Sequence, residues 1–195
     1  LRIIMLKKRI VPTLLLKNQR LVKGKNFENY RDVGDPMSVI KIYSNQYSDE
    51  LILINIGDNE EDFKFLLKTL EKSSEKCFIP ITAGGGIDSL DKVSELIKHG
   101  ADRVLITSAI YESPEFILKA SEKFGKQSII GGIDILENKD KFFLVYGKKR
   151  KIINYKIEEY INKLDQLGVG EILVNFVKRD GEMKGTNIEL LKYIC

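Results

Sequence analysis

Residues 79–109 constrain the fold most, because they contain one complete strand–loop–helix–strand unit. An apolar run over residues 78–83 leads into three glycines at 84–86, and apolar residues then recur at helical spacing over residues 90–97. A second apolar run follows over residues 104–107. Two short apolar strands that are connected through a helix lie parallel in a sheet, so this unit predicts an α/β fold.

The three glycines stand directly after a strand, and two explanations compete for them. Exposed backbone N–H groups at such a place can hold a phosphate group, whereas a tight strand-to-helix turn also favours glycine. Two small hydrogen-bond donors, Thr107 and Ser108, follow the next strand. The carboxyl ends of neighbouring parallel strands lie at one edge of the sheet, which favours a ligand site there.

Composition excludes several classes of function. The net charge of +4 comes from 32 basic and 28 acidic residues that are interspersed along the chain, so no nucleic-acid-binding surface is expected. The basic run at 148–151 is assigned to a solvated turn. Cys77 and Cys195 lack metal-ligand spacing, and His99 is expected to cap a helix. We therefore expect free thiols, no metal and no cofactor.

The chain shows no apolar run of membrane-spanning length and no signal-peptide pattern, so we expect a cytoplasmic protein with no membrane contact. Met5 has the appearance of a natural start. No linker interrupts the sequence, and one domain over residues 1–195 is expected.

Strands and helices alternate along the rest of the chain. We predict strands over residues 9–16, 51–56, 128–134 and 171–177, helices over 36–46, 61–71, 114–124 and 157–167, a hairpin over 142–154, and a final segment over 187–194. Residues 17–35 have the composition of a polar loop, and Asp35-Pro36 is expected to open the first helix. Six strand–helix alternations predict a parallel sheet with helical crossovers.

An internal repeat indicates a barrel. Residues 50–55 resemble residues 171–175, and the strands that end near Leu15 and Asp134 are also spaced about 120 residues apart, which makes two halves of four units each. A closed barrel of this type has about 250 residues, so units seven and eight are not represented. Further chain or another element must then cover the edges of the first and sixth strands.

A series of motifs runs through the chain in a fixed order. They are Arg9-Ile-Val-Pro, Lys17, Arg20-Leu-Val-Lys23-Gly24, Gly34-Asp35-Pro36, Gly84-Gly85-Gly86-Ile87, Gly100-Ala101-Asp102-Arg103-Val104, Gly132-Ile133-Asp134, Gly168, Gly170-Glu171-Ile172-Leu173, Arg179-Asp180-Gly181 and Lys184-Gly185. Together they resemble the HisF family, the cyclase subunits of imidazole glycerol phosphate synthase.

This resemblance implies a (βα)8 TIM barrel of the HisA/HisF ribulose-phosphate-binding type, of which this chain carries about six units. It also implies an active site at the carboxyl ends of the strands. Ammonia from a separate, HisH-like glutaminase subunit would enter at the opposite end and cross the barrel.

The resemblance assigns catalytic roles to few residues. The fifth-strand aspartate of the family matches Asp134, and Lys23 matches the mobile first loop that closes over the substrate. A lone aspartate at a strand end can also be a structural cap. The family's first-strand aspartate is replaced by Leu15, which cannot transfer a proton, and Asn55 and Thr107 replace a family aspartate and asparagine.

Binding and gating roles follow from the same resemblance. One phosphate site would include Gly85, Gly86, Thr107 and Ser108, and part of a second would include Asp180 and Gly181. The ammonia gate matches Arg9, Glu50, Arg103 and Glu171, which all keep the family's charge sign. Charges also flank buried strands simply because strand ends meet water. A ring of four alternating charges could close the barrel floor by charge-assisted hydrogen bonds.

Three functions are compatible with these residues. The first is a synthase subunit that passes ammonia from a glutaminase to an acceptor. The acceptor is expected to be a sugar that is amidated for surface polysaccharide, because residues 14–18 resemble the first strand of a HisF-like subgroup that is encoded with surface-polysaccharide genes. The second is the cyclase (lyase) of histidine biosynthesis, acting on its phosphorylated substrate. The third is a non-enzymatic scaffold whose open edges pair with another copy.

Overall fold

The structure is a computed structural model that describes residues 8–139, 141–147 and 149–194. Three residues with sequence-based predictions, Met5, Lys148 and Cys195, lie outside the described residues. The ten strands form one sheet in the order β3-β2-β1-β4-β5-β6-β7-β8-β9, and β10 pairs with β7.

The elements alternate as the sequence predicts. The strands are β1 (Thr13–Lys17), β2 (Arg20–Lys25), β3 (Glu28–Gly34), β4 (Leu51–Asn55), β5 (Ile81–Gly84), β6 (Arg103–Ile106), β7 (Ile129–Asn138), β8 (Lys141–Tyr146), β9 (Lys151–Ile153) and β10 (Glu171–Phe176). The helices are α1 (Pro36–Asn45), α2 (Glu60–Ser74), α3 (Leu90–Lys98), α4 (Ser108–Glu112), α5 (Pro114–Phe124), η1 (Lys126–Ser128), α6 (Ile157–Gln166) and α7 (Ile188–Ile194).

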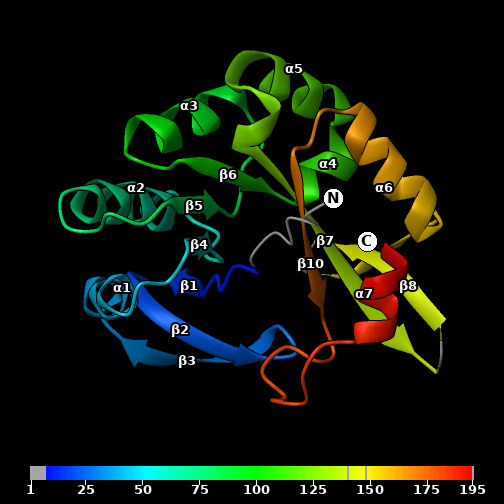
Figure 1. Cartoon of the computed structure of the whole chain (residues 1–195), viewed down its shortest axis with the longest axis horizontal. Helices are drawn as coiled ribbons and strands as arrows, with labels where there is room; N and C mark the ends of the chain where they lie inside the picture. Colours follow the sequence, from blue (N-terminus) through cyan, green and yellow to red (C-terminus); the bar gives the residue numbers. More distant parts are fainter. Residues whose placement is uncertain (1–7, 140, 148, 195) are drawn as a thin grey trace, which may run out of the picture.

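Parallel pairing joins β1, β4, β5, β6, β7 and β10 in that order. Helices α1, α2, α3, α5 and α6 follow one another around the outside of these strands (Figure 1). Each crossover helix covers the sheet because its apolar face is buried, as at Val93 and Leu96 of α3. The predicted α/β fold with a parallel sheet is confirmed.

The parallel strands are apolar on both faces, for two different reasons. Side chains such as Leu51 and Leu53 point to the large core beneath the helices. Alternate residues point to the inner side, where Ile52, Leu105 and Ile130 form a second, smaller cluster. Side chains that fill the inner side in layers are the packing expected for this barrel type.

Local signals set the helix ends. Asp35 caps α1 by accepting a hydrogen bond from the backbone N–H of Ser38 at 2.8 Å, and Pro36 occupies the first turn, as predicted. His99 is the C-cap of α3, with its Nδ1 2.8 Å from the carbonyl oxygen of Glu95. Gly100 follows with a φ of +103°. The expected capping role of His99 is confirmed.

The polar loop predicted over residues 17–35 is wrong, because these residues form the antiparallel hairpin β2–β3. The turn between β1 and β2 uses Asn18 and Gln19, both with positive φ, which suits the twist of a two-residue hairpin turn. Nearly all side chains of β3 are exposed, so the strand carries no alternating apolar pattern. Hydrogen bonding to β2 and not burial therefore defines it.

Two predicted strands begin too early, and one helix was missed. Regular pairing of β1 starts at Thr13 instead of Arg9, because Pro12 has no N–H for the ladder. Likewise β5 begins only after Pro80, and Phe78 is exposed. The short helix α4, opening at Ser108, lies between the strand predicted to end at residue 107 and the helix predicted to begin at residue 114.

The two halves of the chain repeat in space as well as in sequence. Strand β1 is followed by the hairpin β2–β3 and helix α1, and β7 is followed by β8–β9 and α6. Each half then continues into a parallel partner strand, β4 or β10. The repeat thus places Leu15 and Asp134 in equivalent strands.

The sheet remains open between its first and last parallel strands. Within the described residues β10 pairs only with β7, and no ladder joins it to β1. In this same part of the chain, no helix has the length and apolarity to cross a bilayer.

Candidate functional site

Four charged side chains form a closed ring at the amino-terminal end of the parallel strands. Arg9 donates to Glu50, with Nη1 3.2 Å from Oε2, and also to Glu171. Arg103 donates to the same two carboxylates. Every member of this charge ring therefore contacts both members of opposite sign. The sequence placed these residues at strand ends, and the structure brings all four together.

The charge ring is buried on one side and open on the other. Glu50 is only 2% exposed and accepts a further hydrogen bond from the Thr82 hydroxyl at 2.5 Å. Arg9 and the Glu171 carboxylate are partly exposed. A buried carboxylate is stable only when charge and hydrogen bonds compensate it, so Glu50 depends on its neighbours in the ring.

Large exposed apolar side chains lie in segments that lead into the strands at this end of the sheet. Ile10, Tyr47 and Phe78 are 74%, 90% and 93% exposed, and they belong to the segments that precede β1, β4 and β5. The backbone N–H of Ile10 donates to Asp49, the neighbour of Glu50. Exposed apolar groups gathered at one end of a protein are typical of an interaction surface.

Asp134 lies at the opposite end of the strands. Its Oδ1 accepts a hydrogen bond from the Asn175 side-chain N–H at 2.9 Å, and the parallel register of β7 and β10 sets the two residues side by side. Burial raises the pKa of the Asp134 carboxyl, and the Asn175 hydrogen bond opposes that rise. A carboxyl with a raised pKa is suited to proton transfer.

The equivalent position in the first half of the chain is apolar. Leu15 of β1 pairs with Ile54 of β4, and both side chains are partly buried. The Asn55 side chain is buried, and its oxygen accepts a hydrogen bond from the backbone N–H of Gly57 at 2.9 Å. Asn55 thus stabilises a turn. Of the two equivalent positions, Leu15 and Asp134, only Asp134 has a carboxylate.

The glycine loop and the end of β6 lie at adjacent positions. The register pairs Gly84 with Leu105, two residues before Gly86 and Thr107. Gly85 has a φ of +99°, and a Cβ there would lie 1.9 Å from the carbonyl oxygen of Asn55. Only glycine fits at that position, so close packing is sufficient to explain it.

The space around Gly86 is open. No heavy atom lies within 4 Å of a Cβ built at this residue, whose φ is +70°. Its carbonyl oxygen accepts from the Lys92 ammonium at 2.9 Å. Ser108 opens α4, and Thr107 precedes it without a side-chain capping bond. The predicted phosphate-binding role of these residues stays a prediction.

The residues of the second predicted phosphate site, Asp180 and Gly181, lie in the loop after β10. The carbonyl oxygen of Asp180 accepts from the backbone N–H of Asn26, in the tip of the β2–β3 hairpin, at 2.9 Å. A Cβ on Gly181 would come within 2.5 Å of the Gly24 carbonyl oxygen. Burial raises the pKa of the Asp180 carboxyl. This turn is therefore a contact surface for the hairpin.

Lys23 is exposed on β2. Across residues 8–194, apart from the two gaps, its ammonium makes no hydrogen bond or ion pair, and it does not contact Asp134. The structure thus does not bring the two predicted catalytic residues together. The hairpin that carries Lys23 is held at its tip by Arg150, which donates to the Asn26 carbonyl oxygen at 2.5 Å and to Glu28 at 2.9 Å.

A cavity of about 250 Å³ lies beneath this hairpin tip, at the carboxyl end of β10. Its lining residues are Phe27, Val174, Asn175, Phe176, Arg179, Asp180, Met183, Gly185 and Thr186. Sequence reasoning missed Asn175 and the lining side chains after β10, because only the strand register and the loop packing bring them together. In the described part of the chain no cluster of three or more His, Cys, Asp or Glu residues is arranged to hold a metal ion.

Comparison with known proteins decides the family. The sequence model of the histidine biosynthesis protein family matches residues 9–195. The imidazole glycerol phosphate synthase subunit HisF of Staphylococcus aureus strain MRSA252 is 39% identical over 193 residues, which cover 97% of this chain and 76% of the relative. This chain belongs to the HisF family. HisF of strain bovine RF122 / ET3-1 matches with the same identity and coverage.

Membership of the HisF family confirms the expected resemblance and the HisA/HisF type of α/β fold. These relatives are named as a subunit of imidazole glycerol phosphate synthase. None of these names refers to polysaccharide synthesis, so sugar amidination stays a prediction. The comparisons favour the histidine-biosynthesis alternative.

Proposed function

We propose that this chain is the ammonia-using subunit of a synthase of the imidazole glycerol phosphate synthase type. Ammonia would come from a glutaminase partner that binds at the charge ring, and Asp134 would transfer protons at the other end of the strands. The observation that carries this proposal is the closed ring of Arg9, Glu50, Arg103 and Glu171.

The inner side of the sheet suits the passage of a neutral molecule. Between the charge ring and Asp134 the inward-facing side chains include Ile52, Leu105 and Ile130, which form the inner apolar cluster. Moving an ammonium ion along apolar side chains is costly, whereas uncharged ammonia has no such penalty. The ring would close the entrance until a partner rearranges its ion pairs.

The exposed apolar side chains Ile10, Tyr47 and Phe78 support a partner at the same end. Aromatic residues are enriched among the anchors of protein interfaces. A glutaminase bound there would release ammonia directly at the ring. The exposed rim and the buried Glu50 would thus serve docking and gating.

At the reacting end, one carboxylate would have to serve both as acid and as base. The raised pKa of Asp134 makes its protonated form more accessible near neutral pH. Leu15 supplies no proton-transfer group at the equivalent place. We therefore expect slower ring closure than two carboxylates would give, by about 10²-fold for one missing acid–base group.

The apolar pair Leu15 and Ile54 favours a second candidate, in which ammonia is transferred to another phosphorylated acceptor such as a sugar. Ammonia delivery is common to both candidates, and only the product differs. Formation of imidazole glycerol phosphate from the synthase's phosphorylated ribonucleotide substrate would establish the first. Glutaminase stimulation without that product would favour the second.

The decisive experiment measures glutamine hydrolysis by the glutaminase partner with and without this chain. We expect complex formation to raise hydrolysis, and Arg103→Ala to break the link between hydrolysis and ammonia use while added ammonium salt bypasses the defect. Lys64→Ala, an exposed charge on α2, is the matched control. Failure to bind any glutaminase, or equal coupling in Arg103→Ala and the control, would refute the proposed function.

A further inference from the structure

Asn175 is the hydrogen-bonding partner of Asp134, and the orientation of its amide is fixed by chemistry. A carboxylate can only accept, so the Asn175 NH₂ group must face Asp134, as the 2.9 Å contact with Oδ1 shows. The amide oxygen then faces the other way. Asn175 also lines the cavity of about 250 Å³ under the hairpin tip. It therefore joins the predicted acid–base group to the cavity.

The two oxygens of Asp134 differ in their surroundings. Oδ1 is held by Asn175, whereas Oδ2 makes no hydrogen bond with any described residue. The buried side-chain atoms that lack a partner in this part of the chain belong to Asn26, Asp62, Tyr111 and Tyr160. Oδ2 of Asp134 is not one of them, so solvent or a ligand can reach it.

Other polar groups of the described residues near Asp134 form no hydrogen bond with its carboxylate. Tyr111 on α4 and Tyr30 on β3 are close enough to interact with its charge, and burial keeps the pKa of both phenols raised. Arg179, which also lines the cavity, is engaged by Glu137 at 3.0 and 3.3 Å. Among the described residues, only Asn175 hydrogen-bonds the Asp134 carboxylate.

The internal repeat provides a comparison within the same chain. The counterpart of the Asp134 strand carries Leu15, opposite Ile54. By the same strand registers, the counterpart of Asn175 is Ile54, whose side chain has no hydrogen-bonding group. The half of the chain that retains the acid thus also carries the asparagine that contacts it, whereas the other half has an apolar pair at these two positions.

We propose that Asn175 is a positioning residue for Asp134. The Asn175 amide holds Oδ1 of Asp134 and leaves Oδ2 as the oxygen that exchanges a proton with the ligand. The catalytic part of this inference rests on the proposed function. The structural part concerns the ionisation of Asp134 in the free protein. A hydrogen bond to the charged form of a carboxyl favours that form.

The test follows the Asp134 carboxyl by NMR in protein labelled with ¹³C-aspartate, with the signal assigned through Asp134→Asn. In Asn175→Leu, which keeps the size but removes the N–H donor, we expect the acid dissociation constant of Asp134 to fall about tenfold, a rise of about one pH unit in pKa. Asn138→Leu, at the exposed end of β7, should leave the titration unchanged.

A second variant keeps the inference testable if Asn175→Leu does not fold. Asn175→Asp is nearly isosteric and places a second carboxylate against Oδ1, so the pair should titrate in two separated, coupled steps. An unchanged Asp134 titration in folded Asn175→Leu would overturn the inference, and so would two independent titrations in Asn175→Asp.

These outcomes are separate from the fate of the proposed function. If the wild-type protein forms product, the pKa in the pH profile of kcat/KM should move in Asn175→Leu together with the NMR value. A pH profile that stays fixed while the NMR titration moves would overturn the positioning role. If the wild type forms no imidazole glycerol phosphate, the first proposed function fails. The NMR shift alone then still decides whether Asn175 controls the ionisation of Asp134.

Discussion

Asp134 shows at the scale of one residue how a predicted site weakens the fold that carries it. Its half-buried carboxyl has a raised pKa, so the folded state favours the protonated form. Between the ordinary and the raised pKa, the folded protein binds more protons than the unfolded chain. Stability therefore falls as the pH rises through this window, and the loss is complete above it.

Asp134→Asn should consequently stabilise the protein at pH 7. The substitution removes the ionisable group and keeps an oxygen that can accept from Asn175. We expect the free energy of unfolding in urea to rise by about 1 kcal/mol, the usual size of one stabilising substitution. The gain should vanish as the pH falls below the ordinary pKa of aspartate, about 3.9.

Glu122→Gln, an exposed change on α5, is the control for loss of a negative charge alone. Its effect should be small and the same at both pH values. A variant of Asp134 that is less stable than the wild type at pH 7, or whose gain persists in acid, would contradict the raised pKa.

The same residues show what the sequence can and cannot predict about a site. Asp134 and the four ring residues each stand at or next to an end of a predicted strand, and the ends of apolar runs can be recognised in the sequence. Asn175 stands at a strand end too, but its importance depends on the register between β7 and β10. Two strands that are about 40 residues apart in the chain do not reveal their register in their own composition.

At the scale of elements, the hairpin β2–β3 is the largest departure from the predicted fold. Helix α1 was predicted correctly because Asp35-Pro36 is a local start signal. In the hairpin before it, β3 is mostly polar and exposed and β2 buries two adjacent residues, Leu21 and Val22, so neither strand shows an alternating apolar pattern. Asn18, in the turn between β1 and β2, and Asn26, in the turn between β2 and β3, are local clues, since asparagine tolerates positive φ.

Contacts from two other loops hold the tip of this hairpin. Arg150, in the turn between β8 and β9, donates to the Asn26 carbonyl oxygen and to Glu28. From the loop after β10, Asp180 accepts from the Asn26 N–H and Glu182 pairs with Lys25 at 2.9 Å. The hairpin is thus fastened above the cavity from both sides.

Arg150→Ala should release one side of this fastening. We expect backbone amides of β2 and β3 to exchange with deuterium about tenfold faster, which corresponds to about 1.4 kcal/mol of local opening. The global free energy of unfolding should change by less than about 1 kcal/mol, because exposed ion pairs contribute little. Lys149→Ala, the exposed neighbour, is the matched control. Exchange that is equal in the two variants would show that Arg150 does not fasten the hairpin.

On the scale of the whole molecule, single polar contacts and not a β-ladder connect the two sides of the opening between β1 and β10. Arg9, just before β1, pairs with Glu171 at the start of β10. At the other end of the strands, Asn26 bonds Asp180. The repeat in the sequence predicted a barrel-like arrangement, but it could not show that polar contacts would bridge the open side.

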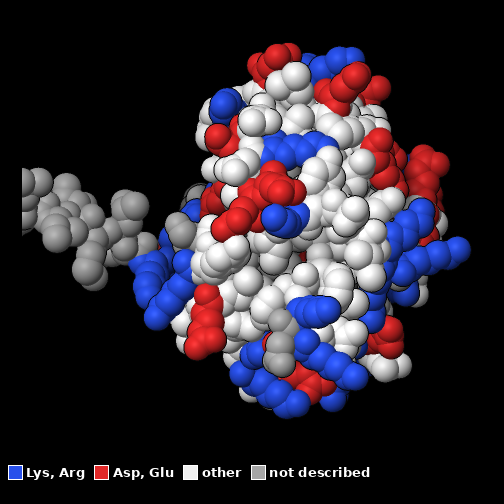
Figure 2. All heavy atoms as spheres, turned by 90° about the vertical axis from the view of Figure 1, so that its right-hand side faces the viewer, with Lys and Arg blue, Asp and Glu red and all other residues white. Residues whose placement is uncertain are grey.

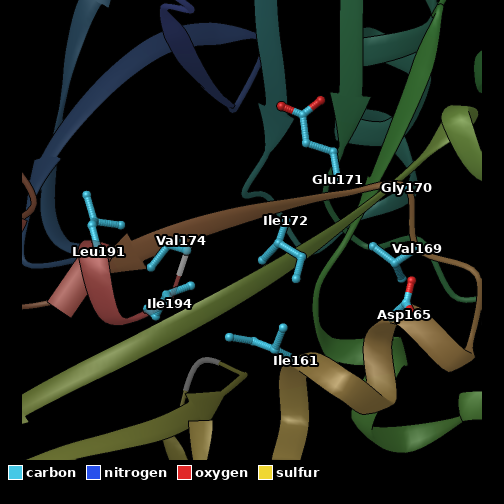
Figure 3. A pocket seen from close by; sticks show the side chains of 9 residues that line it. All are labelled: Ile161, Asp165, Val169, Gly170, Glu171, Ile172, Val174, Leu191 and Ile194. Atoms are coloured by element: carbon cyan, nitrogen blue, oxygen red, sulfur yellow. The ribbon is translucent and has the colours of Figure 1, made fainter. Parts of the chain in front are cut away.

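Within the described part of the chain, the edge of β10 that faces away from β7 pairs with no strand. A groove of about 530 Å³ lies there between α6 and α7. Ile172 and Val174 of β10, Ile161 of α6, and Leu191 and Ile194 of α7 line it, while the Glu171 side chain points away from these apolar groups (Figure 3). On the side of the molecule that bears α6 and α7, charges of both signs are scattered around a large uncharged area (Figure 2).

We therefore predict that the 195-residue chain self-associates through this face. A strand with an unpaired edge beside an apolar groove is a template for pairing with a second copy, which is the non-enzymatic alternative that the sequence left open. Light scattering should show an average mass above the 22.3 kDa of one chain, rising with concentration.

Ile172→Lys should weaken this association about tenfold, or about 1.4 kcal/mol, because a charge placed in the groove must be desolvated when a second copy covers it. Ile152→Lys makes the same change on β9 at a side chain that is already 62% exposed and lies outside the groove, so it should leave the mass unchanged. Circular dichroism identifies any variant that has lost its fold. A wild-type chain that stays at the mass of one copy at every concentration would contradict self-association. Water alone would then hydrogen-bond the unpaired backbone groups of β10, and the end of the sheet that bears the charge ring would remain as the candidate interface.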